Sequence, residues 1–290
     1  MTRSEKIIGT VIVLWGVALL GGFLYTESIS ISIGGQNAKL RNNPYAKPLE
    51  KHSIKYIVTN NADSGEGTLR AGIESGATDI FFDSSMTIKL NSTIEIKKDI
   101  AIYGKTQKGK KLDITLEGSG DPENPFPILN TDFDAENVTI ENITFTKGYA
   151  KQGGAINFTG GWLSSMFKPW SLTIKNCNFI SNSAEWGGGA IFVNSHILTI
   201  TNCTFTENSA HERGGVILAE SAVLSITNST FTSNSVQENG GVVWTYSYAE
   251  ITIADSIFAS NKAPGDEVIF VSDPDKLIIK NSNFTSKNNR

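Results

Sequence analysis

The sequence of 290 residues is 39% apolar and 9% aromatic, which excludes an intrinsically disordered chain and allows a sizeable core. Its 25 basic and 29 acidic side chains are dispersed and leave a net charge of only −4, so nucleic-acid-binding proteins are excluded as a class. Glycine is abundant (27 residues) and proline is scarce (8), a composition that favours short strands joined by tight bends. We therefore expect an all-β protein.

The first predicted element is an apolar helix that begins at Ile7 and ends at Tyr25, 19 residues without a charge. At about 1.5 Å per residue it would span about 28 Å, close to the thickness of the hydrocarbon core of a membrane. Arg3 and Lys6 precede it, so the basic-flank rule predicts a cytoplasmic tail over residues 1–6, a single-pass anchor in the cell membrane and an extracytoplasmic C-terminal domain. A cleaved secretory signal is the alternative, and it would export the same domain without a tether.

A spacer is predicted over residues 26–53, after the anchor over 7–25, with room for one strand in "SISISI". The following segment "DSGEGTLRAGIESG" predicts a short amphipathic helix with Thr68 as N-cap and with Leu69 and Ile73 on its apolar face. We expect this helix to cover the N-terminal end of the folded domain, where strand edges and core would otherwise meet water.

Short alternating segments follow the helix and predict strands at 79–82, 93–96, 100–104 and 112–118. They are less regular than the later part of the chain. We therefore divide the predicted β domain, residues 54–290, into a cap with irregular coils over 54–136 and regular repeats over 137–287.

Six copies of a repeat are centred on phenylalanines that follow one another at steps of 34, 26, 26, 27 and 26 residues. The six are Phe145, Phe179, Phe205, Phe231, Phe258 and Phe284. A period in this range indicates a solenoid whose units stack on one another. Each copy contains an alternating triplet before the phenylalanine, and most contain a glycine pair that leads into another apolar segment. We therefore predict three strands and three bends in each coil of a parallel β-helix, with the phenylalanines stacked inside about 4.8 Å apart.

Asparagines flank the phenylalanines on both sides. The residues three positions before the phenylalanines are Asn142, Asn176, Asn202, Asn228, Asp255 and Asn281. Those three positions after them include Asn182, Asn208, Asn234 and Asn261. Asparagine tolerates left-handed backbone, and identical amides on successive coils can bond one another, so we expect these residues to form ladders at the corners.

The C-terminal half resembles the polymorphic-outer-membrane-protein type of repeat, whose marks are GGAI and FxxN. Here GGAI stands at 153 and 188, GGVI at 214 and GGVV at 240, and FxxN at 179, 205, 231 and 258. "TLRAGI" from Thr68 is similar to the SLREAI-type opening segment of extracellular β-helix proteins. The resemblance covers about residues 54–284 and implies a right-handed parallel β-helix displayed at a cell surface, often in adhesin-like proteins.

Cys177 and Cys203 occupy the same position in adjacent coils. The coil spacing puts their Cα atoms about 4.8 Å apart, within the range of about 4.4 to 6.8 Å that a disulfide needs. Side chains in register on parallel strands point the same way, however, and serines such as Ser229 fill the equivalent place in later coils. A disulfide and a buried pair of thiols are both compatible with the sequence.

An acidic row is predicted beside the glycine bends, from Glu185, Glu212 and Glu238, with His211 and Arg213 next to it. Carboxylates on adjacent coils can hold calcium, and calcium with a basic residue performs the chemistry of polysaccharide lyases of this fold. A solvated row of turns is the alternative, because the register slips by one residue at Glu185.

Aromatic residues suggest a binding surface for sugars or a partner protein. The longest step of the repeat contains the apolar insertion "GGWLSSMFKPW" from Gly160, and further tryptophans occur in later coils. The candidate platforms are Trp162, Phe167, Trp170, Trp186 and Trp244. A flap folded onto the wall of the helix is the alternative for the insertion.

The favoured function is that of a membrane-anchored, adhesin-like surface protein that binds glycans or partners on the cell envelope or a host. No cofactor is required for this function, although calcium is compatible with the acidic row. A polysaccharide lyase or glycoside hydrolase of the pectate-lyase-like fold is the second hypothesis, and a structural component of the cell envelope is the third. We favour binding over catalysis, because the acidic row is the one feature of the sequence that could supply catalytic groups.

Overall fold

The computed structural model describes residues 30–33, 36–39, 53–131, 135–159, 170–194, 196–238, 241–247, 249–264 and 268–285. The chain forms two compact units, Met1–His52 and Ser53–Arg290. In the first unit β1 (Ser30–Ile33) pairs antiparallel with β2 (Gln36–Lys39), so the spacer contains two strands and not one. The predicted anchor over 7–25 lies outside the described residues. Within the described ranges, no helix has the length and apolar character needed to cross a membrane.

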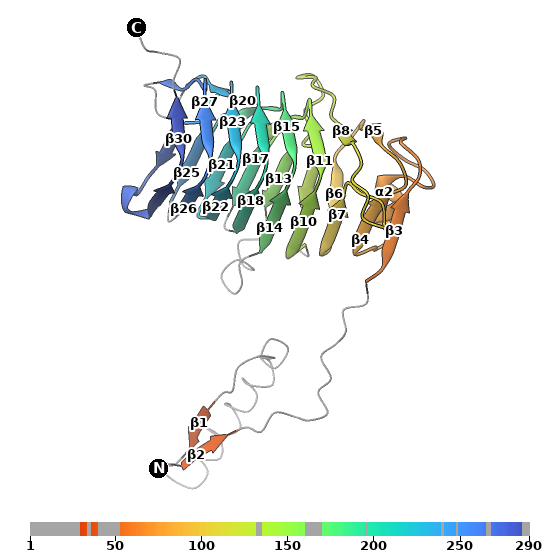
Figure 1. Ribbon diagram of the computed structural model, residues 1–290, viewed down its shortest axis with the longest axis horizontal. Helices are drawn as coiled ribbons and strands as arrows, with labels where there is room; N and C mark the ends of the chain where they lie inside the picture. Colours follow the sequence, from red (N-terminus) through yellow and green to blue (C-terminus); the bar gives the residue numbers. More distant parts are fainter. Residues whose placement is uncertain are drawn as a thin grey trace. The chain divides into compact units, whose positions relative to one another are not determined.

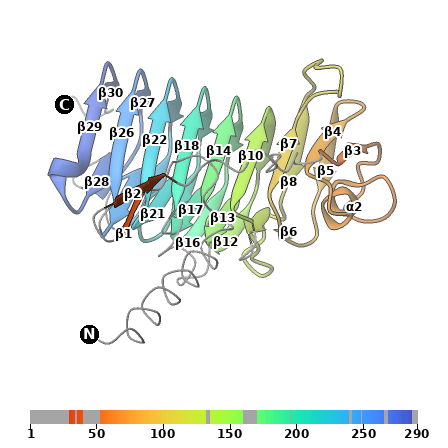
Figure 2. The ribbon, with the colours of Figure 1, turned by 90° about the horizontal axis from the view of Figure 1, so that it is seen from below.

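The second unit is a parallel β-solenoid of about eight turns (Figures 1 and 2). Sheet 1 has nine strands, one from each coil, and the sheet extends along the whole solenoid. They are β3 (Lys55–Val58), β4 (Asp79–Phe82), β7 (Ile100–Tyr103), β10 (Asn137–Glu141), β14 (Ser171–Lys175), β18 (Ile197–Thr201), β22 (Val223–Thr227), β26 (Glu250–Ala254) and β29 (Leu277–Lys280).

Sheet 2 has eight strands and follows sheet 1 in each coil. They are β5 (Met86–Lys89), β8 (Ile114–Glu117), β11 (Ile143–Thr146), β15 (Asn178–Ile180), β19 (Thr204–Thr206), β23 (Thr230–Thr232), β27 (Ile257–Ala259) and β30 (Asn283–Thr285). Sheet 3 has seven strands and closes each coil. They are β6 (Ile94–Ile96), β9 (Leu129–Thr131), β13 (Ile156–Thr159), β17 (Ile191–Asn194), β21 (Ile217–Glu220), β25 (Val243–Tyr246) and β28 (Ile269–Val271).

A short fourth sheet corrects the prediction of three strands per coil. In four successive coils an extra strand lies between sheets 2 and 3. These strands are β12 (Tyr149–Gln152), β16 (Ser183–Gly187), β20 (Ser209–Ala210) and β24 (Ser235–Val236). We call this the short sheet. Each of its strands buries one small apolar residue, such as Ala184 or Ala210. The sequence therefore has no alternating apolar pattern that predicts these strands.

The interior contains the predicted aromatic stack. The rings of Phe179 and Phe205 lie with their centroids 4.7 Å apart and their planes 8° apart, and the same geometry repeats from Phe145 to Phe284. The strand registers explain it, because each phenylalanine is the direct partner of the phenylalanine in the next coil. The prediction of an internal phenylalanine stack is confirmed.

The two asparagine columns have different structures. The corner between sheets 1 and 2 is formed by the column from Asn142 to Asn281, whose residues all have left-handed backbone with φ between 48° and 58°. At the second corner the left-handed residue is the one before the asparagine, for example Glu207 with φ of 56°. The asparagine that follows it, Asn208, therefore points inward and is fully buried.

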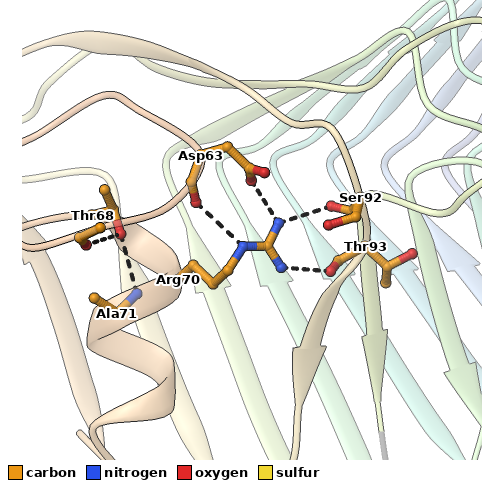
Figure 3. A network of polar contacts seen from close by, with 7 residues as sticks. Asp63, Thr68, Arg70, Ala71, Ser92 and Thr93 are labelled. Carbon is orange, nitrogen blue, oxygen red and sulfur yellow. Dashed lines mark hydrogen bonds and ion pairs between the residues drawn. The ribbon is translucent and has the colours of Figure 1, made fainter.

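The predicted capping helix is present as α2 (Leu69–Glu74), at the N-terminal end of the solenoid in Figures 1 and 2. The hydroxyl of Thr68 accepts a hydrogen bond from the Ala71 N–H, as expected of an N-cap. Arg70 fastens the cap to the first coils (Figure 3). Its guanidinium pairs with Asp63 and donates to the Ser92 carbonyl at 3.0 Å and the Thr93 carbonyl at 2.7 Å.

Candidate binding groove on the short sheet

A shallow groove of about 440 Å³ crosses the outer face of the short sheet. β16 contributes Glu185 and Trp186, and the segment after β20 contributes His211 and Glu212. Tyr149, from β12 in the preceding coil, closes one side. The groove therefore brings together one predicted aromatic platform and two residues of the predicted acidic row.

Trp186 is the aromatic centre of this groove. The residue is 49% exposed, whereas the adjacent Gly187 is buried, and the irregular register of β16 against β12 interrupts the regular alternation of faces between Ala184 and Gly187. The Nζ atom of Lys151 in the preceding coil lies over the indole ring, 6.0 Å from its centroid. A ring held in this way by the sheet is ordered without being covered, as a stacking platform requires.

The other predicted aromatics are placed differently. Trp162 and Phe167 lie outside the described residues. Trp170 is only 2% exposed, because it stacks against the ring of His196 at a centroid distance of 4.8 Å, and it is not available as an open platform. Trp244 is half-buried on the outer face of sheet 3, where it stacks against Phe270. Of the predicted aromatics that the structure describes, Trp186 alone has a largely exposed ring.

The acidic row does not converge on one point. Ala184 pairs with Ala210 and Gly187 with Arg213, so Glu185 takes the level of His211, and Glu212 takes the level of Trp186. Glu238 instead approaches His211, with 3.6 Å between Oε1 and Nδ1. In the part of the chain that the structure describes, no three acidic, histidine or cysteine side chains are close enough together to hold a metal ion. Glu185 and Glu212 thus lie at different levels of the short sheet, and calcium binding at Glu185, Glu212 and Glu238 stays a prediction.

The cysteine pair consists of free, buried thiols. The backbone N–H of Cys177 donates to Sγ of Cys203 at 3.4 Å, and the N–H of Cys203 donates to Oγ of Ser229 at 3.2 Å. Cysteine and serine thus have the same structural role here, because each side chain accepts a hydrogen bond from a backbone N–H of the preceding coil. Burial raises the pKa of the Cys177 thiol, which favours its protonated, unreactive form.

The exposed asparagine ladder lies at the corner between sheets 1 and 2. Asn202 donates to Asn176 at 3.2 Å, and Asn228 donates to Asn202 at 2.7 Å. Asn281 donates to Asp255 at 3.2 Å, so the carboxylate takes the accepting role of an amide oxygen. Asn142 instead donates to its neighbour Glu141. We interpret the ladder as structural, because its side-chain amides form hydrogen bonds with one another.

A second polar cluster lies on the outer face of sheet 3 and was not predicted. Arg213 follows the groove residue Glu212, and its guanidinium carbon lies 5.6 Å from the centre of the Trp244 ring. Glu220, at the end of β21, accepts a hydrogen bond from Asn194 at 3.3 Å. Burial raises the pKa of Glu220, and the positive charge of Arg213 partly opposes the shift. The one sequence signal is the polar residue at the end of the apolar segment "VILAE".

The comparison with protein families supports the fold. Residues 132–289 match the family model described as a right-handed β-helix region. A solved structure from Parabacteroides merdae, described as a candidate glycosyl hydrolase, is 12% identical, with 79% of this chain and 97% of that chain covered and a TM-score of 0.28. A comparison with curated proteins finds no match. Because the family model matches more than half of the sequence and the structure is a parallel solenoid over the same residues, the chain belongs to the right-handed β-helix family.

Proposed function

We propose that this β-helix is an adhesin-like surface protein that binds a glycan chain in the groove on the short sheet. The observation that carries the proposal is the exposed ring of Trp186, set among hydrogen-bonding side chains in a groove of about 440 Å³. An aromatic face stacks on the apolar face of a sugar, and the neighbouring carboxylates and hydroxyls bond to its hydroxyl groups.

The shape of the groove also favours an extended ligand. The short sheet presents equivalent positions on successive coils, such as Ser183, Ser209 and Ser235, which are paired in register. Columns of this kind match a ligand that repeats along its length, as a glycan does. The anchor proposed over residues 7–25 would hold the solenoid at the outer side of the cell membrane.

One observation favours a second candidate function, the cleavage of a glycan. A carboxyl group whose pKa is raised by burial can serve as a general acid, and Glu220 is such a group. Hydrolysis also requires a second carboxylate across the scissile bond. Binding therefore remains the main proposal.

The test is a screen of the full chain against immobilised neutral, amino and acidic oligosaccharides, in which binding and released product are measured together. We expect binding without product, and we expect Trp186→Ala to weaken it about tenfold or more, as for a central aromatic contact. Tyr246→Ala is the matched control, because Tyr246 is equally aromatic and 54% exposed but lies on β25, in sheet 3.

Each other outcome of the screen contradicts the proposal in a defined way. Product release that is lost in Glu220→Gln would establish the enzymatic function. Binding that Trp186→Ala leaves unchanged would place the ligand elsewhere. A chain that neither binds nor releases any of the oligosaccharides would be a structural component of the envelope.

A further inference from the structure

The groove on the short sheet carries negative charge without a fixed positive charge of its own. Two of the side chains that line it, Glu185 and Glu212, are carboxylates, and none of its described lining residues is a lysine or an arginine. Both residues are half-buried, so their charges are screened less by solvent than those of fully exposed groups. The groove therefore favours a positively charged ligand and disfavours an acidic one.

The two carboxylates stand next to the ring of Trp186 in two directions. Glu185 directly precedes Trp186 on β16. Glu212 takes the level of Trp186 in the next coil, because Gly187 pairs with Arg213, and neighbouring coils are about 4.8 Å apart. A ligand group at the ring therefore lies beside carboxylates from two successive coils.

The nearest basic side chains leave these two carboxylates unpaired. Nδ1 of His211 lies 3.6 Å from Oε1 of Glu238. The guanidinium carbon of Arg213 lies 5.6 Å from the centre of the Trp244 ring, on the outer face of sheet 3. Among the residues that the structure describes, no ion pair or side-chain hydrogen bond engages either of the two carboxylates that line the groove. Their charge is thus available to a ligand.

The ring of Trp186 attracts the same kind of charge. The face of an indole attracts an ammonium group within about 6 Å of its centroid. Nζ of Lys151 lies 6.0 Å from this centroid, at the outer limit of such a contact. Lys151 is exposed and is not among the described residues that line the groove, so an amine bound in the groove can approach the ring more closely. An aromatic face beside two carboxylates is a recognition site for a protonated amine.

We propose that the ligand of the groove is an amino-glycan, whose protonated amines lie on the ring of Trp186 and beside Glu185 and Glu212. This inference rests on the proposed binding of a glycan in the groove and adds the chemical class of that glycan. An acidic glycan is repelled by the same carboxylates. A neutral or N-acetylated glycan stacks on the ring without the charge-assisted hydrogen bonds.

The test compares three hexasaccharides that share one backbone linkage and differ in one substituent. The glucosamine hexasaccharide of chitosan carries amines, the corresponding chitin hexasaccharide carries N-acetyl groups, and cellohexaose carries hydroxyl groups. Calorimetric titration of the full chain in neutral detergent, at a mildly acidic pH that keeps the amines protonated, gives the three dissociation constants. We expect the glucosamine hexasaccharide to bind about tenfold or more tightly than the other two. The preference should shrink as the ionic strength rises, because salt screens charges at an open groove.

The ratio of two dissociation constants separates recognition of charge from loss of fold. A chain with both Glu185→Gln and Glu212→Gln should bind the glucosamine and the chitin hexasaccharides with dissociation constants within about twofold of each other, because glutamine keeps hydrogen-bonding groups but has no charge. Glu66→Gln is the matched control. It removes one negative charge at the capped end of the solenoid, where Glu66 is exposed, and should leave the preference unchanged.

The failure of this inference differs from the failure of the proposed function. Equal binding of the three hexasaccharides that is lost in Trp186→Ala would overturn the amino-glycan and leave a glycan groove. A preference for the amine that the double variant retains would also overturn it, because the amine would then be recognised elsewhere. A chain that binds no oligosaccharide at all would remove the proposed function and this inference together.

Discussion

Asn182 donates both its backbone N–H and its side-chain Nδ2 to the Oδ1 atom of Asn208, each at 3.0 Å, although the two residues are 26 positions apart. Asn208 repeats the pattern with Asn234, and its Nδ2 also donates to the carbonyl of Phe179 at 2.9 Å. These asparagines are fully buried. The side chain of Asn208 thus satisfies two backbone groups of the preceding coil and fixes the register of the two coils, because an unpaired polar group there would be costly.

Replacement of Asn208 by alanine should lower the free energy of unfolding by about 2–4 kcal/mol, because it leaves the Asn182 N–H and the Phe179 carbonyl buried without partners. Urea unfolding followed by circular dichroism measures the change. The control is Asn202→Gly in the exposed ladder, which keeps the left-handed backbone and should cost about 1 kcal/mol or less. Equal losses for the two variants would contradict this account of the buried ladder.

Cys203 should be replaceable by serine but not by alanine. Serine already fills the same position at Ser229 and Ser256, where its oxygen accepts the N–H of the preceding coil. Cys203→Ser should therefore change stability by less than about 1 kcal/mol, whereas Cys203→Ala should cost about 1–3 kcal/mol through the unpaired N–H of Cys177. Unfolding of the two variants measures the difference.

The same thiols should resist alkylation in the folded chain, because burial raises the pKa of Cys177 and excludes the reagent. Mass spectrometry after iodoacetamide treatment at neutral pH should show no modified cysteine without denaturant and two with it. A chain whose denatured form is alkylated only after reduction would contain a disulfide, contrary to the structure.

Arg70→Ala should loosen the N-terminal cap and leave the distant coils unchanged. The variant removes the ion pair to Asp63 and the bonds to the Ser92 and Thr93 carbonyls, which should cost about 2 kcal/mol or more in local opening. Hydrogen exchange should become faster in β3 and β4 but not in β26, because solenoid coils interact with their neighbours only. Arg70→Lys keeps the positive charge but lacks the planar guanidinium. Its hydrogen-exchange rates in β3 and β4 should therefore lie between those of the parent chain and those of Arg70→Ala.

Glu220→Gln tests the raised pKa of that carboxyl group. A raised pKa in the folded state gives a contribution to stability that is fully present below the pKa of the unfolded chain, about 4.3, and is lost as the pH rises through the folded value. Glutamine has no charge to desolvate and keeps an oxygen for the Asn194 hydrogen bond. The stability of the variant relative to the parent should therefore increase between pH 4 and pH 7 in chemical unfolding. A difference that does not vary with pH would contradict the assignment.

Much of the fold could be predicted from the sequence because a solenoid converts sequence period into spatial contact. A step of 26 or 27 residues sets Phe205, Phe231 and Phe258 directly over one another, and Thr68 marks the start of the capping helix through its side-chain oxygen. The short sheet could not be predicted, because a strand with one small buried residue shows no alternation of apolar and polar residues.

The candidate site was only partly predictable, for a related reason. Trp186 is visible in the sequence, but its exposure depends on which face of β16 it occupies. The slip of one residue at Glu185 decides which residues of the acidic row share a level, and the pairing of Ala184 with Ala210 sets Glu185 beside His211 and not beside Glu212. Glu220 was missed because its distinguishing property is burial, which the sequence does not display.

The central claim is that the ring of Trp186 meets the ligand, and oxidation of tryptophan by N-bromosuccinimide tests it at that residue. In the free protein Trp186, 49% exposed, should be oxidised readily, while Trp170, 2% exposed, should be spared and serves as the internal control. The oligosaccharide that binds best in the screen, added at saturation, should slow oxidation of Trp186 about tenfold or more, as peptide mass spectrometry measures it, because a stacked sugar covers the ring. Unchanged oxidation of Trp186 in the presence of bound oligosaccharide would contradict the account.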